Sequence, residues 1–324
     1  MEYDLNKRIV ANVLKHIPKN KKVVVYLVNT LNISRESAYR RMRGDIPFTI
    51  EELIKLATKL DFSIDTIYGQ EKQNHAFDDF SRLGNNTTDF FIVMLKKYDE
   101  LYERIKNANT LETIMAFNTF PPPFYMDFFN LFKFMYYKWL HQDECIYRNT
   151  PYSKTVLPEE VIIYQRKMKG SYLHGNNVVL ILDMNIILNL IQEIQYFYHR
   201  KLLTNEELLI LKEEVVQLID LYENIVQSGK MGSAKVHIYL SSLCVNSNTV
   251  YYEYDDKMEP FFWIFTINPV VIQNPGIISM QLKWLYTLKR QSSLITQSNE
   301  IMQAEFFFRQ REYIDKYLSI ENTL

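Results

Sequence analysis

Basic side chains are concentrated in one short segment near the start of the chain. Between Lys19 and Arg43 there are seven lysines and arginines but one acidic residue, whereas the whole chain of 324 residues has a formal net charge of −1. A local excess of positive charge can neutralise the phosphates of double-stranded DNA, and such binding depends strongly on salt. This segment is therefore the first candidate for a nucleic-acid contact.

The elements around the basic segment have the spacing of a helix-turn-helix. Apolar residues spaced i, i+3, i+4 and i+7 predict a helix over 24–31, and Ser34 can cap a second helix over 35–43. Between them Asn32 is expected to adopt left-handed backbone, which asparagine tolerates better than most residues. The second helix would then present its outer face to base edges. A solvated helical hairpin with incidental charge is the alternative.

A capping box supports further helices behind this pair. Thr49 and Glu52 have the spacing in which side chain and backbone bond reciprocally at a helix start, and Ser63 can cap a short fifth helix that ends at Gly69. The stretch Val24–Gly69 resembles the phage repressor/Cro (Xre-type) helix-turn-helix family, and it reads VVYLVNTLNISRESAYRRMRGDIPFTIEELIKLATKLDFSIDTIYG.

The resemblance implies a five-helix, lambda-repressor-like domain over residues 1–69 of a transcription regulator. Its implied partner is double-stranded DNA, and the implied assembly is a homodimer. Asn32 stands where the family usually has a turn glycine, and Val28 stands where a small alanine is common. By position in the motif, base-facing or near-base residues would be Ser34, Arg35, Glu36, Tyr39 and Arg40. Phosphate contacts would be Lys21, Lys22 and Arg43.

Residues 70–110 are interpreted as a polar linker followed by a connecting helix over 89–107. One face of that helix is apolar at helical spacing. Its members are Phe91, Met94, Leu95, Tyr98, Leu101, Tyr102 and Ile105. The stripe predicts either part of a homodimer interface or a contact with the chain's own core, and both readings stay open.

Residues 111–324 are expected to form a larger α+β regulatory domain, so the whole chain is α+β and mostly helical. Strands are predicted at 113–117, 235–245, 249–254 and 261–268. Helices are predicted at 125–141, 184–200, 205–227, 275–290 and 299–318. Asn246-Ser247-Asn248 is interpreted as a hairpin turn between the second and third of these strands. Helices and strands appear in separate runs without a regular βαβ alternation.

The remaining features favour regulation over catalysis. Hydrophobic residues make up 47% and charged residues 23%, which is typical of a globular chain, and 8 glycines are few for a dinucleotide-binding or P-loop enzyme. No familiar catalytic or metal-binding motif occurs, so we expect no enzyme, cofactor or metal. No apolar run is long enough to span a bilayer, which predicts a cytoplasmic protein. Two roles remain open for the large domain: a sensor of a small-molecule effector, or a module that docks a protein partner.

Overall fold

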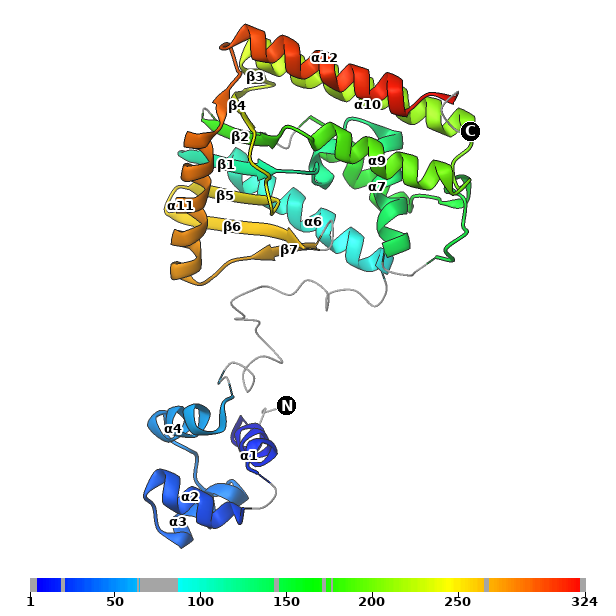
Figure 1. Cartoon of the computed structure of the whole chain (residues 1–324). Coiled ribbons are helices and arrows are strands. Elements are labelled where there is room, and N and C mark those ends of the chain that lie inside the picture. The colour runs from blue at the N-terminus through cyan, green and yellow to red at the C-terminus, as the bar shows by residue number, and fades with distance from the viewer. Residues whose placement is uncertain are drawn as a thin grey trace. The chain divides into compact units, whose positions relative to one another are not determined.

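The computed structural model describes residues 5–18, 21–62, 64, 87–142, 146–170, 173–175, 177–264 and 268–320. The chain divides into two compact units, Met1–Asp78 and Asp79–Leu324 (Figure 1). No helix in these ranges is both long and apolar enough to cross a membrane.

The first unit is a small helical domain with its own core. Its helices are α1 (Leu5–His16), α2 (Val23–Leu31), α3 (Arg35–Arg43) and α4 (Ile50–Leu60). Val13, Leu27, Ala38 and Leu56 lie at the centre of a separate apolar cluster. The predicted fifth helix, 63–69, falls outside the described residues except for Ile64.

The second unit is built on one mixed sheet. Its strands are β1 (Leu111–Phe117), β2 (Val178–Asp183), β3 (Lys230–Met231), β4 (Ala234–Ser241), β5 (Thr249–Tyr254), β6 (Lys257–Ile264), β7 (Asn268–Val271) and β8 (Ser293–Leu294). The order is β3-β4-β2-β1-β5-β6-β7, with β8 paired to β4. The pairs β1–β2 and β2–β4 are parallel, and the pairs β1–β5, β5–β6 and β6–β7 are antiparallel.

Helices cover both faces of this sheet (Figure 1). They are α6 (Thr87–Lys106), α7 (Phe129–Gln142), α8 (Glu159–Met168), α9 (Ile186–His199), α10 (Asn205–Ser228), α11 (Pro275–Gln291) and α12 (Glu300–Tyr317), with 3-10 turns at Pro122–Tyr125 and Tyr152–Lys154. Successive side chains of β1 point to opposite faces of the sheet. On one face Met115 and Phe117 lie in the main apolar core, together with side chains of α6, α7, α9, α10 and α12. Ile114 and Ala116 pack on the other face against Leu285 of α11. The α+β class is therefore confirmed.

Two predictions about the sheet are wrong. β4 and β5 do not form a hairpin, because β2 and β1 lie between them, and the hairpin instead joins β5 to β6. The turn between β5 and β6 contains Asp255, whose backbone is left-handed with a φ of 49°. Helices and strands are also less segregated than predicted, because helical crossovers join β1 to β2 and β2 to β4 in parallel. β2 is buried at every position, so its apolar run lacks the alternation that marks a half-exposed strand.

The predicted connecting helix, α6, is part of the second unit's core. Phe91 and Leu95 are fully buried, and Tyr98, Leu101, Tyr102 and Ile105 are each less than a tenth exposed. The indole N–H of Trp263 in β6 donates a hydrogen bond to the Tyr98 hydroxyl. This burial corrects the dimer-interface expectation for the stripe Phe91, Leu95, Tyr98, Leu101, Tyr102 and Ile105. Its side chains already pack against their own sheet and α7, so they are not available to a second copy.

Candidate nucleic-acid interface and a polar pocket

The turn between α2 and α3 has the backbone that the sequence predicts. Asn32 lies in the left-handed region with φ 56° and ψ 48°, and its N–H donates to the Val28 carbonyl at 2.9 Å. The Ser34 hydroxyl accepts from the Ser37 N–H at 3.1 Å and so caps α3. Gly44 ends α3 at a φ of 83°. The tight turn and both caps fix where the second helix begins and ends.

One face of α3 is buried and the opposite face is open. Ala38 is fully buried against Leu27 of α2, while Val28 and Met42 are half-buried beside them. On the other face every predicted base-facing residue is exposed, and Tyr39 retains 53% of its accessible surface. Those residues are Ser34, Arg35, Glu36, Tyr39 and Arg40. A short helix with one open polar face is the element that a helix-turn-helix inserts into the major groove.

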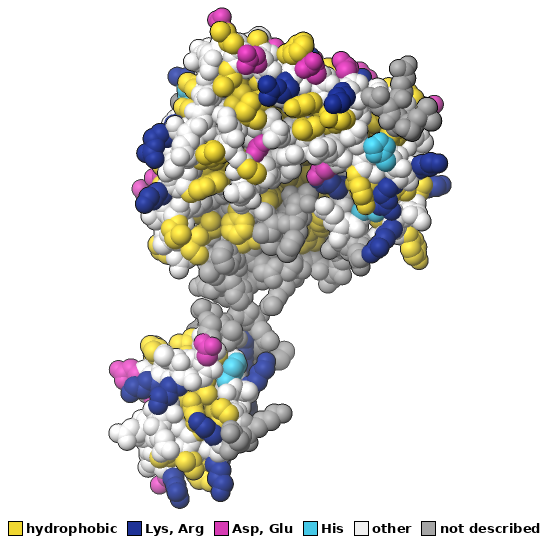
Figure 2. Space-filling view, viewed as in Figure 1, with side chains coloured by type: hydrophobic (Ala, Val, Ile, Leu, Met, Phe, Trp, Pro, Cys, Tyr) yellow, Lys and Arg dark blue, Asp and Glu magenta, His cyan; other side chains and the backbone are white. Residues whose placement is uncertain are grey.

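The predicted phosphate contacts are exposed as well. Lys21 and Lys22 precede α2, and the ammonium of Lys21 lies 5.3 Å from the centre of the Tyr26 ring. Arg43 forms an exposed ion pair with Asp45 at 2.9 Å, which water and salt weaken easily. Figure 2 shows Lys and Arg side chains outnumbering acidic ones on the visible face of this unit.

One basic residue of the segment has a structural role. The Arg41 guanidinium bonds both carboxylate oxygens of Glu52 in α4 at 2.8 Å, and both side chains are largely buried. Arg41 is thus turned away from the open face of α3. Arg41 is one of the seven basic residues between Lys19 and Arg43, but charge alone does not show which side of a helix a residue occupies.

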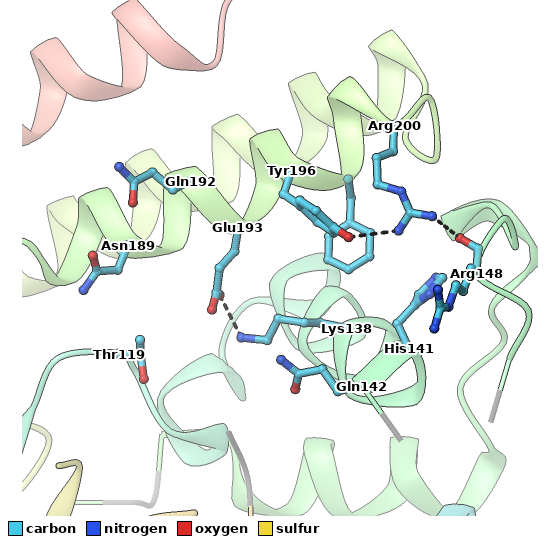
Figure 3. A pocket seen from close by; sticks show the side chains of 11 residues that line it. Thr119, Lys138, His141, Gln142, Arg148, Asn189, Gln192, Glu193, Tyr196 and Arg200 are labelled. Atoms are coloured by element: carbon cyan, nitrogen blue, oxygen red, sulfur yellow. Dashed lines mark hydrogen bonds and ion pairs between the residues drawn. The ribbon is translucent and has the colours of Figure 1, made fainter. Parts of the chain in front are cut away.

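A second candidate site lies in the larger unit. A cavity of about 760 Å³ opens between α7 and α9, beside the segment that follows β1 (Figure 3). This volume is in the range of small-molecule sites. Most of the residues that line the cavity are polar or charged. The lining comprises Thr119, Lys138, His141, Gln142, Arg148, Asn189, Gln192, Glu193, Tyr196, Phe197 and Arg200.

An ion pair between a buried lysine and a half-buried glutamate crosses this cavity. Lys138 of α7 is 7% exposed, and its ammonium donates to the Glu193 carboxylate of α9 at 2.7 Å. Figure 3 shows the two side chains pointing toward each other from facing helices. Withdrawing charged groups from water costs free energy, and the short contact between the ammonium and the carboxylate offsets part of that cost.

Cations gather at one end of the cavity. Arg200 donates to the Tyr196 hydroxyl at 3.2 Å and to the Arg148 carbonyl at 2.6 Å, which holds its guanidinium at the rim. His141 lies beside them, and its Nε2 is buried without a hydrogen-bond partner among the described residues. Burial lowers the pKa of His141, with the Arg200 charge acting in the same direction. The imidazole is therefore mainly neutral at pH 7.

No pattern in the sequence indicates this cavity. Its side chains come from the segment after β1, from α7, from the following loop and from α9, and their spacing along the chain shows no motif. His141 was one of six scattered histidines. Only the tertiary packing of two helices brings these residues together.

Comparison with known proteins supports the first site. Residues 7–94 match the model of the BetR domain, a family of helix-turn-helix-type DNA-binding domains. The match continues beyond residue 69, where the sequence pattern placed the domain boundary, and into α6. No curated protein and no solved structure matches the chain. The N-terminal part of this chain is accordingly similar to BetR domains, and it carries a helix-turn-helix-type DNA-binding domain.

Proposed function

We propose that the protein is a sequence-specific transcription regulator that inserts α3 into the major groove in the manner of Xre/Cro-type repressors. The open face of α3 carries the proposal, because Arg35, Tyr39 and Arg40 project from a helix whose other face is buried. Arginine can bond the O6 and N7 atoms of guanine with two donors, so Arg40 is a suitable base reader. Lys21, Lys22 and Arg43 would neutralise flanking phosphates.

The proposal includes a homodimer and an operator with two half-sites. One helix-turn-helix covers one half-site, and two copies related by symmetry read a palindrome with half-sites about one helical turn apart, roughly 34–36 Å. Because the α6 stripe is buried in its own unit, the contact between copies would use other surfaces. Footprinting on selected DNA should show two protected half-sites.

The larger unit is proposed to sense a ligand without catalysis. The cavity between α7 and α9 supports this role, because it combines the volume of a small-molecule site with converging polar groups. The alternative role, docking of a protein partner, is favoured by α11, where Met280 is 72% exposed and Ile277 and Trp284 lie on the same face. Loss of a protein partner by a Met280→Glu variant would favour docking, whereas an unchanged response to a small-molecule effector in that variant would favour sensing.

Selection of bound sequences from a random DNA library tests the DNA-binding role. The wild-type chain should enrich one motif, and Arg40→Ala should lose about 1–3 kcal/mol on that motif and relax the preference at one base. Arg290→Ala, at the exposed end of α11, is the matched control and should leave the motif unchanged. An unchanged motif in Arg40→Ala would show that α3 is not the reading helix.

A further inference from the structure

Two lysines face each other across the hairpin of β3 and β4, at one edge of the sheet (Figure 1). Lys230 of β3 lies directly opposite Lys235 of β4, and both side chains are exposed. The N–H of Val236 donates to the Gly229 carbonyl at 2.9 Å, so the lysine pair falls at a non-hydrogen-bonded position of the ladder, where opposite side chains lie closest. Like charges in this arrangement destabilise a sheet. The pair therefore has a cost that the fold itself does not explain.

A third lysine extends the positive charge along β4. The Lys289 ammonium of α11 lies 5.4 Å from the centre of the Tyr239 ring, and Tyr239 shares a face of β4 with Lys235 and His237. Burial lowers the pKa of His237, and the charges of Lys235 and Lys289 act in the same direction. The imidazole is therefore mainly neutral at pH 7, and the positive potential of this face comes from the lysines.

The three lysines lack close acidic partners. Lys230, Lys235 and Lys289 form no ion pair with a carboxylate of the described ranges. In the row of side chains that crosses the sheet at Lys235, the uncharged Asn177 comes next and Glu112 of β1 follows, about 10 Å from the lysine. That separation is close to the Debye length at roughly 0.1 M salt, so Glu112 compensates the lysines only weakly.

The tip of the hairpin leaves room for a ligand. Gly232 and Ser233 form its two-residue turn, and both are exposed. Gly232 has a φ of 57°, and beyond its chain neighbours no heavy atom lies within 4 Å of the position that a Cβ atom would take there. An anion can therefore reach the lysine pair from the open side of the tip, where the Ser233 hydroxyl can also donate to it.

We propose that the β3–β4 hairpin, with Lys230, Lys235 and Lys289, is a second contact of this chain with DNA and binds phosphates of the duplex backbone. Lysine is a common phosphate binder, and a duplex presents phosphates at short intervals. A few lysines bind DNA weakly by themselves, but DNA held by the N-terminal domain has a high effective concentration for a second site on the same chain. This linkage favours DNA over an acidic protein surface as the occupant. The inference deepens the proposed function and rests on it, because the ligand is the DNA that α3 would read.

The test measures DNA binding by the full chain and by a Lys230→Gln/Lys235→Gln double variant, using fluorescence anisotropy over a series of salt concentrations. The probes are a selected duplex and a scrambled duplex of equal length, each with flanking DNA on both sides. The double variant should bind both duplexes at least about tenfold more weakly at roughly 0.15 M salt, and its slope of log K against log salt should fall by about two units. Unchanged affinity and slope would overturn the inference. A loss confined to the selected duplex would contradict phosphate binding.

A second double variant, Lys96→Gln/Lys154→Gln, is the matched control. It removes the same charge from exposed positions of the same unit. Lys96 belongs to α6, which packs on the face of the sheet opposite to α11. The control should keep the wild-type slope. An equal decrease in both double variants would reflect net charge alone and would overturn the assignment to the hairpin.

Lys235→Glu separates a binding role from a structural one. The substitution places opposite charges across the hairpin, so the urea midpoint of unfolding should rise, whereas DNA affinity should fall at least about tenfold. A lower midpoint would show that the lysine pair serves the fold and would overturn the inference.

Failure of the proposed function gives a different result from failure of the hairpin site. A wild-type chain that binds neither duplex would refute the regulator itself. Sequence-specific binding by the wild type, with the same affinity and slope in the hairpin variants, would refute the hairpin site alone.

Discussion

Arg41 and Glu52 join α3 to α4, the helix that follows it. The Nε and Nη2 atoms of Arg41 each lie 2.8 Å from a carboxylate oxygen of Glu52. The Oε2 atom of Glu52 also accepts the N–H of Thr49 at 3.0 Å, which completes the capping box of α4. The Glu52 carboxylate thus caps the first turn of α4 and holds Arg41 of α3, so loss of this side chain should affect both helices.

Glu52→Ala should destabilise the first unit by about 2–3 kcal/mol, because it leaves the Arg41 charge without its partner and the Thr49 N–H uncapped. Hydrogen exchange of the α3 and α4 amides in the full chain measures the change. Asp45→Ala is the control, since its pair with Arg43 is exposed and contributes less than about 1 kcal/mol. Equal protection in the two variants would show that the Arg41 pair does not hold α3.

Lys22→Ala should weaken DNA binding for all sequences alike. Lys22 is exposed directly before α2, where it would meet a phosphate and not a base. Loss of one phosphate contact should reduce the slope of log K against the logarithm of the salt concentration by about one unit. Fluorescence anisotropy on a selected duplex and on a scrambled one gives both slopes. A loss confined to the selected duplex would mean that Lys22 reads sequence.

Features that depend on a few neighbouring residues were predicted well. The Ser34 cap, the Thr49 capping box and the left-handed Asn32 all occur as the sequence indicates, because each is decided within about four residues. The helix over 205–227 matches α10, whose capping box at Thr204 is likewise local.

Features that depend on distant residues were not predictable in the same way. β4 pairs with β2 rather than with β5, its neighbour in sequence, and no local pattern encodes that choice. The apolar spacing of the α6 stripe does not distinguish a contact with a second copy from a contact with its own sheet, since both environments are apolar. The polar cavity depends on α7 and α9, which are more than forty residues apart in the chain.

The stability of the second unit should fall as the pH decreases below 6.5, the ordinary pKa of histidine. Burial lowers the pKa of both His141 and His237 in the folded chain. The unfolded chain then binds protons more readily, so this stability is fully present above the unfolded pKa and is lost as the pH falls toward the folded pKa. Urea unfolding between about pH 7.5 and about pH 5.5 measures the loss. His141→Asn should show a smaller loss, and an identical slope would contradict the assignment to His141.

Gln310→Met should stabilise the second unit. Gln310 of α12 is fully buried and faces an apolar lining that includes Phe120 and Ile219, and its Oε1 has no partner among the described residues. The Nε2 of Gln310 donates to the Phe306 carbonyl of the same helix at 3.2 Å, so only the oxygen is unpaired. Removing this buried, unpaired oxygen by an apolar side chain of similar size should add about 1 kcal/mol. Gln303→Met is the control, because Gln303 bonds the carbonyls of Ile295 and Ser298 and should lose stability instead. A destabilised Gln310→Met would indicate either a further partner for the amide oxygen or a larger contribution from the bond to the Phe306 carbonyl.

Leu95→Ala should destabilise the second unit by about 2–5 kcal/mol, because Leu95 is fully buried in the core that α6 shares with the sheet and α7. Urea unfolding followed by tryptophan fluorescence measures this unit alone, since Trp139, Trp263 and Trp284 all lie within it. Lys96→Ala changes the adjacent exposed residue and should have little effect. Light scattering should give the same mass for both variants as for the wild type, because a core residue does not touch a second copy. A reduced mass with unchanged stability would indicate that the α6 stripe contributes to an interface between copies.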